Sequence, residues 1–141
     1  MSDAWDTNVL VRLLVADDPA QTDQVRELAA SLSPQRPARL TKIVLVETYW
    51  VLTRGYSVSR EDTIRGLKGL LSVPDFAIED EAQVSRALDS ALDGADLPDA
   101  LLHEAALAAG VDVVTFDKAA AKRFGWHLLA SNDGGSGSDA Q

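Results

Sequence analysis

Five acidic side chains in four separate segments occupy positions from which they could share one cation. Asp6 and Asp117 each follow an expected strand directly, at the start of the next helix. In open parallel sheets ligands bind outside the carboxyl ends of the strands, so both side chains are expected at one edge of the sheet. Taken singly, each is also explained as a helix N-cap, because Asp is favoured at that position.

Glu47 lies in segment 43–52, where almost every other residue is apolar. A helix that is apolar all round is buried, and an isolated buried charge is too costly to persist. We therefore expect Glu47 to be paired, metal-bound or protonated. A salt bridge to Arg12 or Arg54 explains this residue as well as a functional role does.

Asp96 and Asp99 lie three residues apart at the start of an expected helix. Asp96 fits an N-cap and Asp99 its capping-box partner. The same spacing puts both on one helix face, with side-chain roots about 5–6 Å apart. Two carboxylates aimed the same way repel each other or share a cation. His103, one turn further on, could steer a phosphate, although an ordinary histidine at the edge of the core is the simpler interpretation.

Together these segments predict one acidic cluster. The chain has no Cys and only two His, and carboxylates without such ligands select Mg²⁺ or Mn²⁺. Such a site supports phosphoryl transfer, with two cations roughly 4 Å apart bridging the scissile phosphate. Neighbouring neutral side chains are expected to orient the ligands or a metal-bound water. The expected ligands are Asp6, Glu47, Asp96, Asp99 and Asp117, and the neutral neighbours are Thr7, Asn8 and Thr115.

Length and composition indicate one ordinary globular domain. The chain has 141 residues, of which 46% are hydrophobic and 25% charged. The absence of Cys excludes a disulfide scaffold, a zinc ribbon and a thiol nucleophile. No apolar run reaches the roughly 18 residues of a membrane span, and the N-terminus lacks the basic region of a secretory signal. A cytoplasmic location is therefore expected.

The net charge of −9 limits how the chain could act on nucleic acid. A polyanion is repelled at long range by such a field. Any work on nucleic acid must therefore use a local basic patch or cations held in an acidic site. Surface carboxylates that favour solubility account for most of the 22 acids.

Extended segments alternate with helices along the chain. Strands are expected up to Trp5 and at 38–41, 76–78, 111–116 and 126–129. Caps at Asp18, Ser59, Asp80 and Asp96 begin helices, and further helices cover 42–54 and 118–124. This order predicts a three-layer α/β fold around a mostly parallel sheet of four to five strands. Residues 1–130 form this domain, and the Gly/Ser-rich segment 131–141 is expected to be a disordered tail.

Four short motifs follow one another along the chain: DTNVLVR at 6–12, VLVETYWVL at 44–52, ADLPDAL at 95–101 and TFD at 115–117. In this order they resemble the motifs of the PIN-domain ribonucleases, and most closely those of the VapC-type toxins of bacterial toxin–antitoxin pairs. The likeness runs from about Asp3 to Leu129. One departure is the start at 2–5, where relatives usually carry an aliphatic strand, so the first strand is expected to be short.

The resemblance implies a Mg²⁺-dependent endoribonuclease that cuts tRNA, rRNA or mRNA by in-line attack of metal-bound hydroxide, leaving a 5′-phosphate. It also implies a homodimer, and a cognate VapB-like antitoxin that blocks the acidic pocket. Asp6, Glu47, Asp99 and Asp117 would form the acidic quartet, with Asp96 as a fifth acid. The basic side chains expected at RNA phosphates, each also explained as a surface charge, are Arg12, Arg54, Lys118, Lys122 and Arg123.

Two other functions fit parts of the same pattern. One is a catalytically inactive relative whose acidic pocket only docks a basic partner protein, which the intact set of acids disfavours. The other is a phosphate-handling receiver-like domain. That domain would need a Thr and a Lys on separate strands, whereas Thr115 and Lys118 lie close together.

Overall fold

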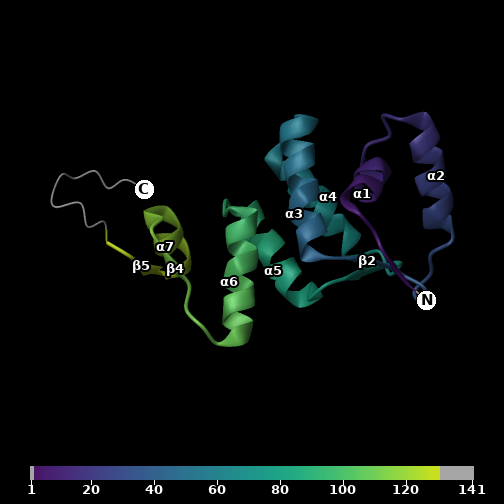
Figure 1. Ribbon diagram of the computed structural model, residues 1–141. Coiled ribbons are helices and arrows are strands. Elements are labelled where there is room, and N and C mark those ends of the chain that lie inside the picture. The colour runs from purple at the N-terminus through teal and green to yellow at the C-terminus, as the bar shows by residue number, and fades with distance from the viewer. Residues whose placement is uncertain (1, 131–141) are drawn as a thin grey trace.

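Strands and helices alternate along the chain, as the sequence patterning predicted (Figure 1). The computed structural model describes residues 2–130, so the expected tail at 131–141 lies outside the described residues. Every pair of named strands is parallel, which confirms the α/β class. The strands are β1 (Asp3–Ala4), β2 (Ala38–Leu40), β3 (Phe76–Ile78), β4 (Val114–Thr115) and β5 (His127–Leu128).

Seven α-helices connect or follow these strands within residues 2–130, and the π-helical turn η1 (Val51–Gly55) continues the third of them. The helix expected at 42–54 is therefore present, with its last turn widened. The α-helices are α1 (Thr7–Leu14), α2 (Pro19–Ala30), α3 (Lys42–Trp50), α4 (Arg60–Leu70), α5 (Glu81–Leu92), α6 (Leu97–Ala109) and α7 (Lys118–Phe124).

Local capping chemistry sets where several helices begin. The Ser59 hydroxyl and the Asp18 carboxylate each accept a hydrogen bond from the backbone N–H three residues later, as predicted. The predicted cap at Asp80 is wrong. Asp80 has a φ of +45° and makes no capping bond. Its carboxylate is instead 2.8 Å from Lys42 Nζ, in an ion pair between the start of α5 and that of α3.

One hydrophobic core is formed by side chains of β2, β3 and helices α1 to α6. Each fully buried leucine in it contributes roughly 1.5–3 kcal/mol relative to an exposed one. The first strand is only two residues long, as expected, and Trp5 directly after it is 3% exposed. The Trp5 ring meets Phe76 of β3 edge to face, with ring centroids 5.4 Å apart. Trp5 therefore anchors the short strand in the core.

The single sheet expected from the sequence is divided into two. One sheet has the order β1-β2-β3, and the other contains only β4 and β5. The strand expected at 111–116 is reduced to Val114–Thr115, which pairs with β5. Val114 and Phe116 are 57% and 56% exposed, although their residue types favour burial.

We call β4, α7 and β5 together the C-terminal unit (residues 114–128). Figure 1 shows it beyond α6, on the side away from β2 and α1. An aromatic cluster holds it to α6. Phe124 and Trp126 stack with ring centroids 4.9 Å apart, and Trp126 Nε1 donates a hydrogen bond to His103 Nδ1 at 3.1 Å. His103 is thus a structural residue that joins α6 to the C-terminal unit.

Candidate acidic site

Three of the five predicted acids line one pocket of about 220 Å³ between α6 and the C-terminal unit. Asp96 and Asp117 are there because each caps a helix. The Asp96 carboxylate accepts a hydrogen bond from the Asp99 N–H at 3.0 Å, and Asp117 accepts one from the Ala120 N–H at 3.0 Å. Both caps were predicted from the sequence. The full lining is Gly94, Asp96, Asp99, Asp117, Ala119, Ala120, Arg123 and Phe124.

Neighbouring backbone and side-chain groups fix the two loops that carry these acids. Arg60, at the start of α4, donates a hydrogen bond to the carbonyl of Ala95, directly before Asp96. On the other side the Thr115 hydroxyl accepts a hydrogen bond from the Asp117 N–H at 2.9 Å. Thr115 therefore fixes the turn that carries Asp117, and the role predicted for it toward a cation or a metal-bound water stays a prediction.

Asp99 is the acid most affected by this environment. Burial raises the pKa of its carboxyl, and the charges of Asp96 and Asp117 raise it further. Like charges gathered in one pocket disfavour ionisation, and a bound cation removes that penalty. The pocket therefore favours the binding of a positively charged group.

Asp6 and Glu47 form a second acidic pair, joined by Thr7. Asp6 begins α1 and accepts a hydrogen bond from the Thr7 N–H at 2.7 Å. The Thr7 hydroxyl, in a residue only 8% exposed, donates to Glu47 Oε1 on α3 at 2.6 Å. One buried threonine thus ties together the first and second acidic segments. Asn8, the other neutral residue predicted beside them, lines a groove between α1 and α2 instead.

The interpretation of Glu47 as a buried charge is wrong. Glu47 is exposed, and Ile43, one turn earlier on the same face of α3, is 67% exposed. This apolar helix therefore shows one face to solvent. The salt bridge to Arg12 or Arg54, one of the two explanations considered for Glu47, is not formed within residues 2–130, where its partner is the Thr7 hydroxyl. The Arg54 guanidinium lies over the Trp50 ring, 3.9 Å from its centroid.

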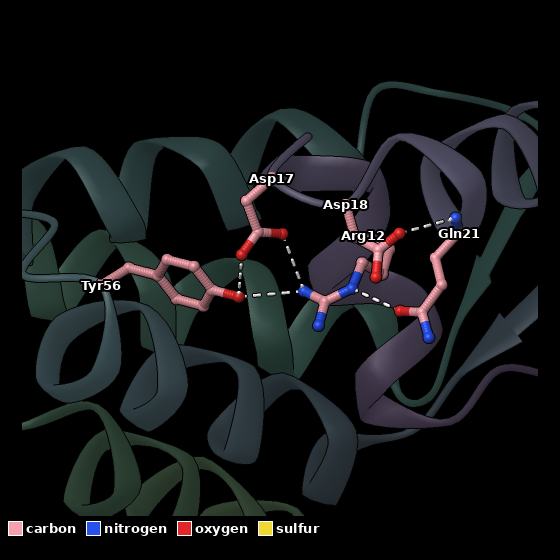
Figure 2. A network of polar contacts seen from close by, with 5 residues as sticks. All are labelled: Arg12, Asp17, Asp18, Gln21 and Tyr56. Atoms are coloured by element: carbon pink, nitrogen blue, oxygen red, sulfur yellow. Dashed lines mark hydrogen bonds and ion pairs between the residues drawn. The ribbon is translucent and has the colours of Figure 1, made fainter.

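Arg12 belongs to a polar network between α1, the start of α2 and the turn after η1 (Figure 2). Its guanidinium donates hydrogen bonds to Gln21, Asp17 and the Tyr56 hydroxyl at 2.7, 3.0 and 2.9 Å. Tyr56 in turn donates to Asp17 at 2.7 Å. The hydrogen bond with Tyr56 is the main cause that raises the pKa of Arg12. Arg12 is therefore engaged within the fold, away from the pocket between α6 and α7.

The predicted basic contacts differ in their relation to this pocket. Lys118 and Lys122 are exposed side chains of α7, whose N-cap is Asp117. Arg123 lines the pocket itself, and within residues 2–130 its guanidinium has only long contacts, to Asp93 at 3.5 and 3.9 Å. Sequence reasoning missed Phe124 in the lining and the partners of Arg12. The contact of Arg12 with Tyr56 has no local signal, because the two residues are 44 apart, whereas Asp17 and Gln21 lie only 5 and 9 residues from Arg12.

The donor set suits a hard divalent cation in its chemistry, because it consists of carboxylates. Its arrangement in one copy does not, since no three His, Asp or Glu side chains within residues 2–130 are placed to hold a metal ion. The acids occur as two groups, one on α1 and α3 and one at the starts of α6 and α7.

The part of the chain that the structure describes also contains no helix long and apolar enough to cross a membrane.

Comparison with known proteins identifies the family. The family model of the PIN domain matches residues 5–126, which is most of the chain and contains all five predicted acids. The chain therefore belongs to the PIN-domain family. A search of curated proteins gave no match.

Proposed function

We propose that this PIN-domain protein is a divalent-cation-dependent endoribonuclease and acts as the toxin of a toxin–antitoxin pair. Membership of the family implies nuclease-type activity in general. The observation that carries the proposal further is the pocket lined by Asp96, Asp99 and Asp117. There the pKa of Asp99 is raised by burial and by its two acidic neighbours.

The charge pattern around this pocket supports a polyanionic substrate that is bound locally. The chain as a whole carries −9, so attraction to RNA must come from a small region. Arg123 in the lining, with Lys118 and Lys122 on the same helix, provides cationic groups beside the acids. Mg²⁺ or Mn²⁺ on the carboxylates would supply the remaining positive charge that a phosphodiester needs.

A cognate antitoxin would act on the same pocket. A basic side chain of such a partner could occupy the acidic pocket and so compete with the cation and with RNA. This part of the proposal rests on the resemblance to VapC-type toxins and on the acidity of the pocket.

An RNA-cleavage assay tests the proposal. The full chain is incubated with mixed tRNA and with unstructured synthetic RNA, in Mg²⁺, Mn²⁺ or EDTA. We expect cleavage with either cation, none in EDTA, and none by Asp99→Asn. Asp112→Asn is the matched control, because Asp112 is an exposed aspartate outside the pocket. Equal cleavage in EDTA, or by Asp99→Asn at the parental rate, would overturn the proposal.

One observation favours a second candidate function, an inactive module that docks a basic partner. Within one copy the pair Asp6 and Glu47 is separate from the pocket acids, and no group of three is placed to hold a metal. The same assay distinguishes the two functions. A docking module would bind a basic peptide through the pocket and would leave every RNA intact under all the conditions above.

A further inference from the structure

The solvent-facing side of α3 and η1 carries a stripe of side chains that lies outside the acidic pocket. Its members are four, three and four residues apart, a spacing that keeps them on one helix face. In order they are Ile43, Glu47, Trp50 and Arg54. All are exposed except Trp50, which is partly buried and packs against the hydrophobic core. The stripe therefore leads from an acid paired with Asp6 to an aromatic ring and a cation.

Trp50 and Arg54 form a contact pair at the end of this stripe. The Arg54 guanidinium lies over the Trp50 ring, 3.9 Å from its centroid. At that separation the ring attracts the cation. Within residues 2–130 the guanidinium has no carboxylate partner and makes no hydrogen bond. Its N–H donors are therefore available to a ligand while the ring holds the group in place.

The turn below this pair is well supported. Tyr49 meets the Trp50 ring edge to face, with ring centroids 5.1 Å apart. The Tyr56 N–H donates to the Val51 carbonyl at 3.2 Å, which is the hydrogen bond of the π-helical turn, and such turns are frequent at functional sites. The Tyr56 hydroxyl accepts from Arg12, so η1 is tied to α1 (Figure 2). A pair on such a support loses little freedom when a ligand binds.

The chemistry of the pair selects the kind of ligand. Aromatic rings and guanidinium planes stack on the bases of unpaired RNA, and a guanidinium also binds phosphate. With a net charge of −9 the chain must hold a polyanion through local groups of this kind. A basic partner protein would be repelled by Arg54, whereas an RNA strand finds both a stacking surface and a phosphate contact.

We propose that Trp50 and Arg54 bind one nucleotide of single-stranded RNA, with the base stacked on the pair and a phosphate on the Arg54 guanidinium. Trp50 is three residues beyond Glu47, roughly 5 Å along the helix axis, so the nucleotide lies beside the pair Asp6 and Glu47. Its place next to a scissile bond rests on the proposed function, whereas binding of the strand does not. The site favours unpaired RNA, because a base within a duplex has no free face to stack.

Equilibrium binding in EDTA at low salt tests the site without cleavage. The full chain is titrated with a fluorescein-labelled octamer of adenosine, and with a ribose-phosphate strand of the same length and charge that lacks bases. We expect the octamer to bind roughly 5-fold to 150-fold more tightly, which is the range for stacking one base. Trp50→Leu should remove most of this preference, because it deletes the ring.

Substitutions of Arg54 separate its charge from its shape. Arg54→Gln should lower the slope of log K against log salt by about 0.7, the value for one phosphate of a single strand. Arg54→Lys should keep that slope and lose preference for the strand with bases, because an ammonium group is not planar. Arg26→Gln is the matched control. It removes the same charge from an exposed arginine on α2, and should change neither the slope nor the preference.

Several results would overturn the site. They are no binding by the parent, equal binding of the two strands, or an unchanged preference in Trp50→Leu. Should Trp50→Leu fail to fold, Arg54→Lys decides, because it alters only an exposed side chain. Cleavage in Mg²⁺ is measured separately. A parent that cuts no RNA but binds the octamer through Trp50 would refute the proposed function and leave this site standing, and a parent that cuts RNA without preferring bases would do the reverse.

Discussion

Asp96 has two roles that different substitutions separate: it caps α6 and it lines the acidic pocket. Asp96→Ala removes the acceptor for the Asp99 N–H as well as the negative charge. Asp96→Asn removes the charge and keeps an acceptor, because Asn and Asp are equally good N-caps. The two variants should therefore differ in stability although they carry the same net charge.

The expected size of that difference follows from the cap. Replacing an N-cap Asp by Ala costs about 1 kcal/mol. With an unfolding entropy of about 2.1 cal/mol/K per residue, a domain of this size loses about 4 °C in Tm for each kcal/mol. The N–H of Asp99 at the start of α6 has no other acceptor among the hydrogen bonds of residues 2–130. Asp96→Ala is thus expected to melt about 4 °C below Asp96→Asn.

Thermal unfolding followed by circular dichroism in EDTA measures this difference without any contribution from bound metal. Both variants are then compared for Mg²⁺-dependent stabilisation, which should be weaker than that of the parent in each. Equal Tm values for the Ala and Asn variants would refute the reasoning, because they would mean that the Asp96 carboxylate does not cap α6 in solution.

Three further predictions concern single side chains of the two acidic groups. Because burial and neighbouring charges raise the pKa of Asp99, its contribution to stability is complete below the unfolded pKa of about 3.9 and is lost as the pH rises through the folded pKa. Asp99→Asn should therefore be more stable than the parent at pH 7 but not at pH 3 in metal-free urea unfolding, and a gap constant with pH would contradict this. Thr7→Val should lower the free energy of unfolding by about 1 kcal/mol, the value of an ordinary hydrogen bond and below that of a buried bond to a charged group, because Glu47 is exposed; Thr7→Ser should lose less, and equal urea midpoints would exclude a contribution from this bond. Arg123→Gln should weaken RNA binding and lower the slope of log K against log salt by about 1, and an unchanged slope would exclude a phosphate contact.

Features set by neighbours in sequence were predictable from this chain. The caps at Asp18, Ser59, Asp96 and Asp117 depend on one side chain and a backbone N–H three residues away, so sequence spacing determines them. Asp80 shows the limit of this reasoning. Asp80 precedes its helix with the same spacing as the other four caps. Its carboxylate makes an ion pair with Lys42 of another helix and does not accept a capping hydrogen bond.

Features set by distant partners were not predictable. The apolar run around Glu47 indicated burial, whereas α3 leaves one face exposed, and sequence alone does not say which face has no neighbour. The strand at 111–116 was recognisable by its residue types. Its pairing was not, because parallel pairing joins segments with no local connection and depends on which edge is free.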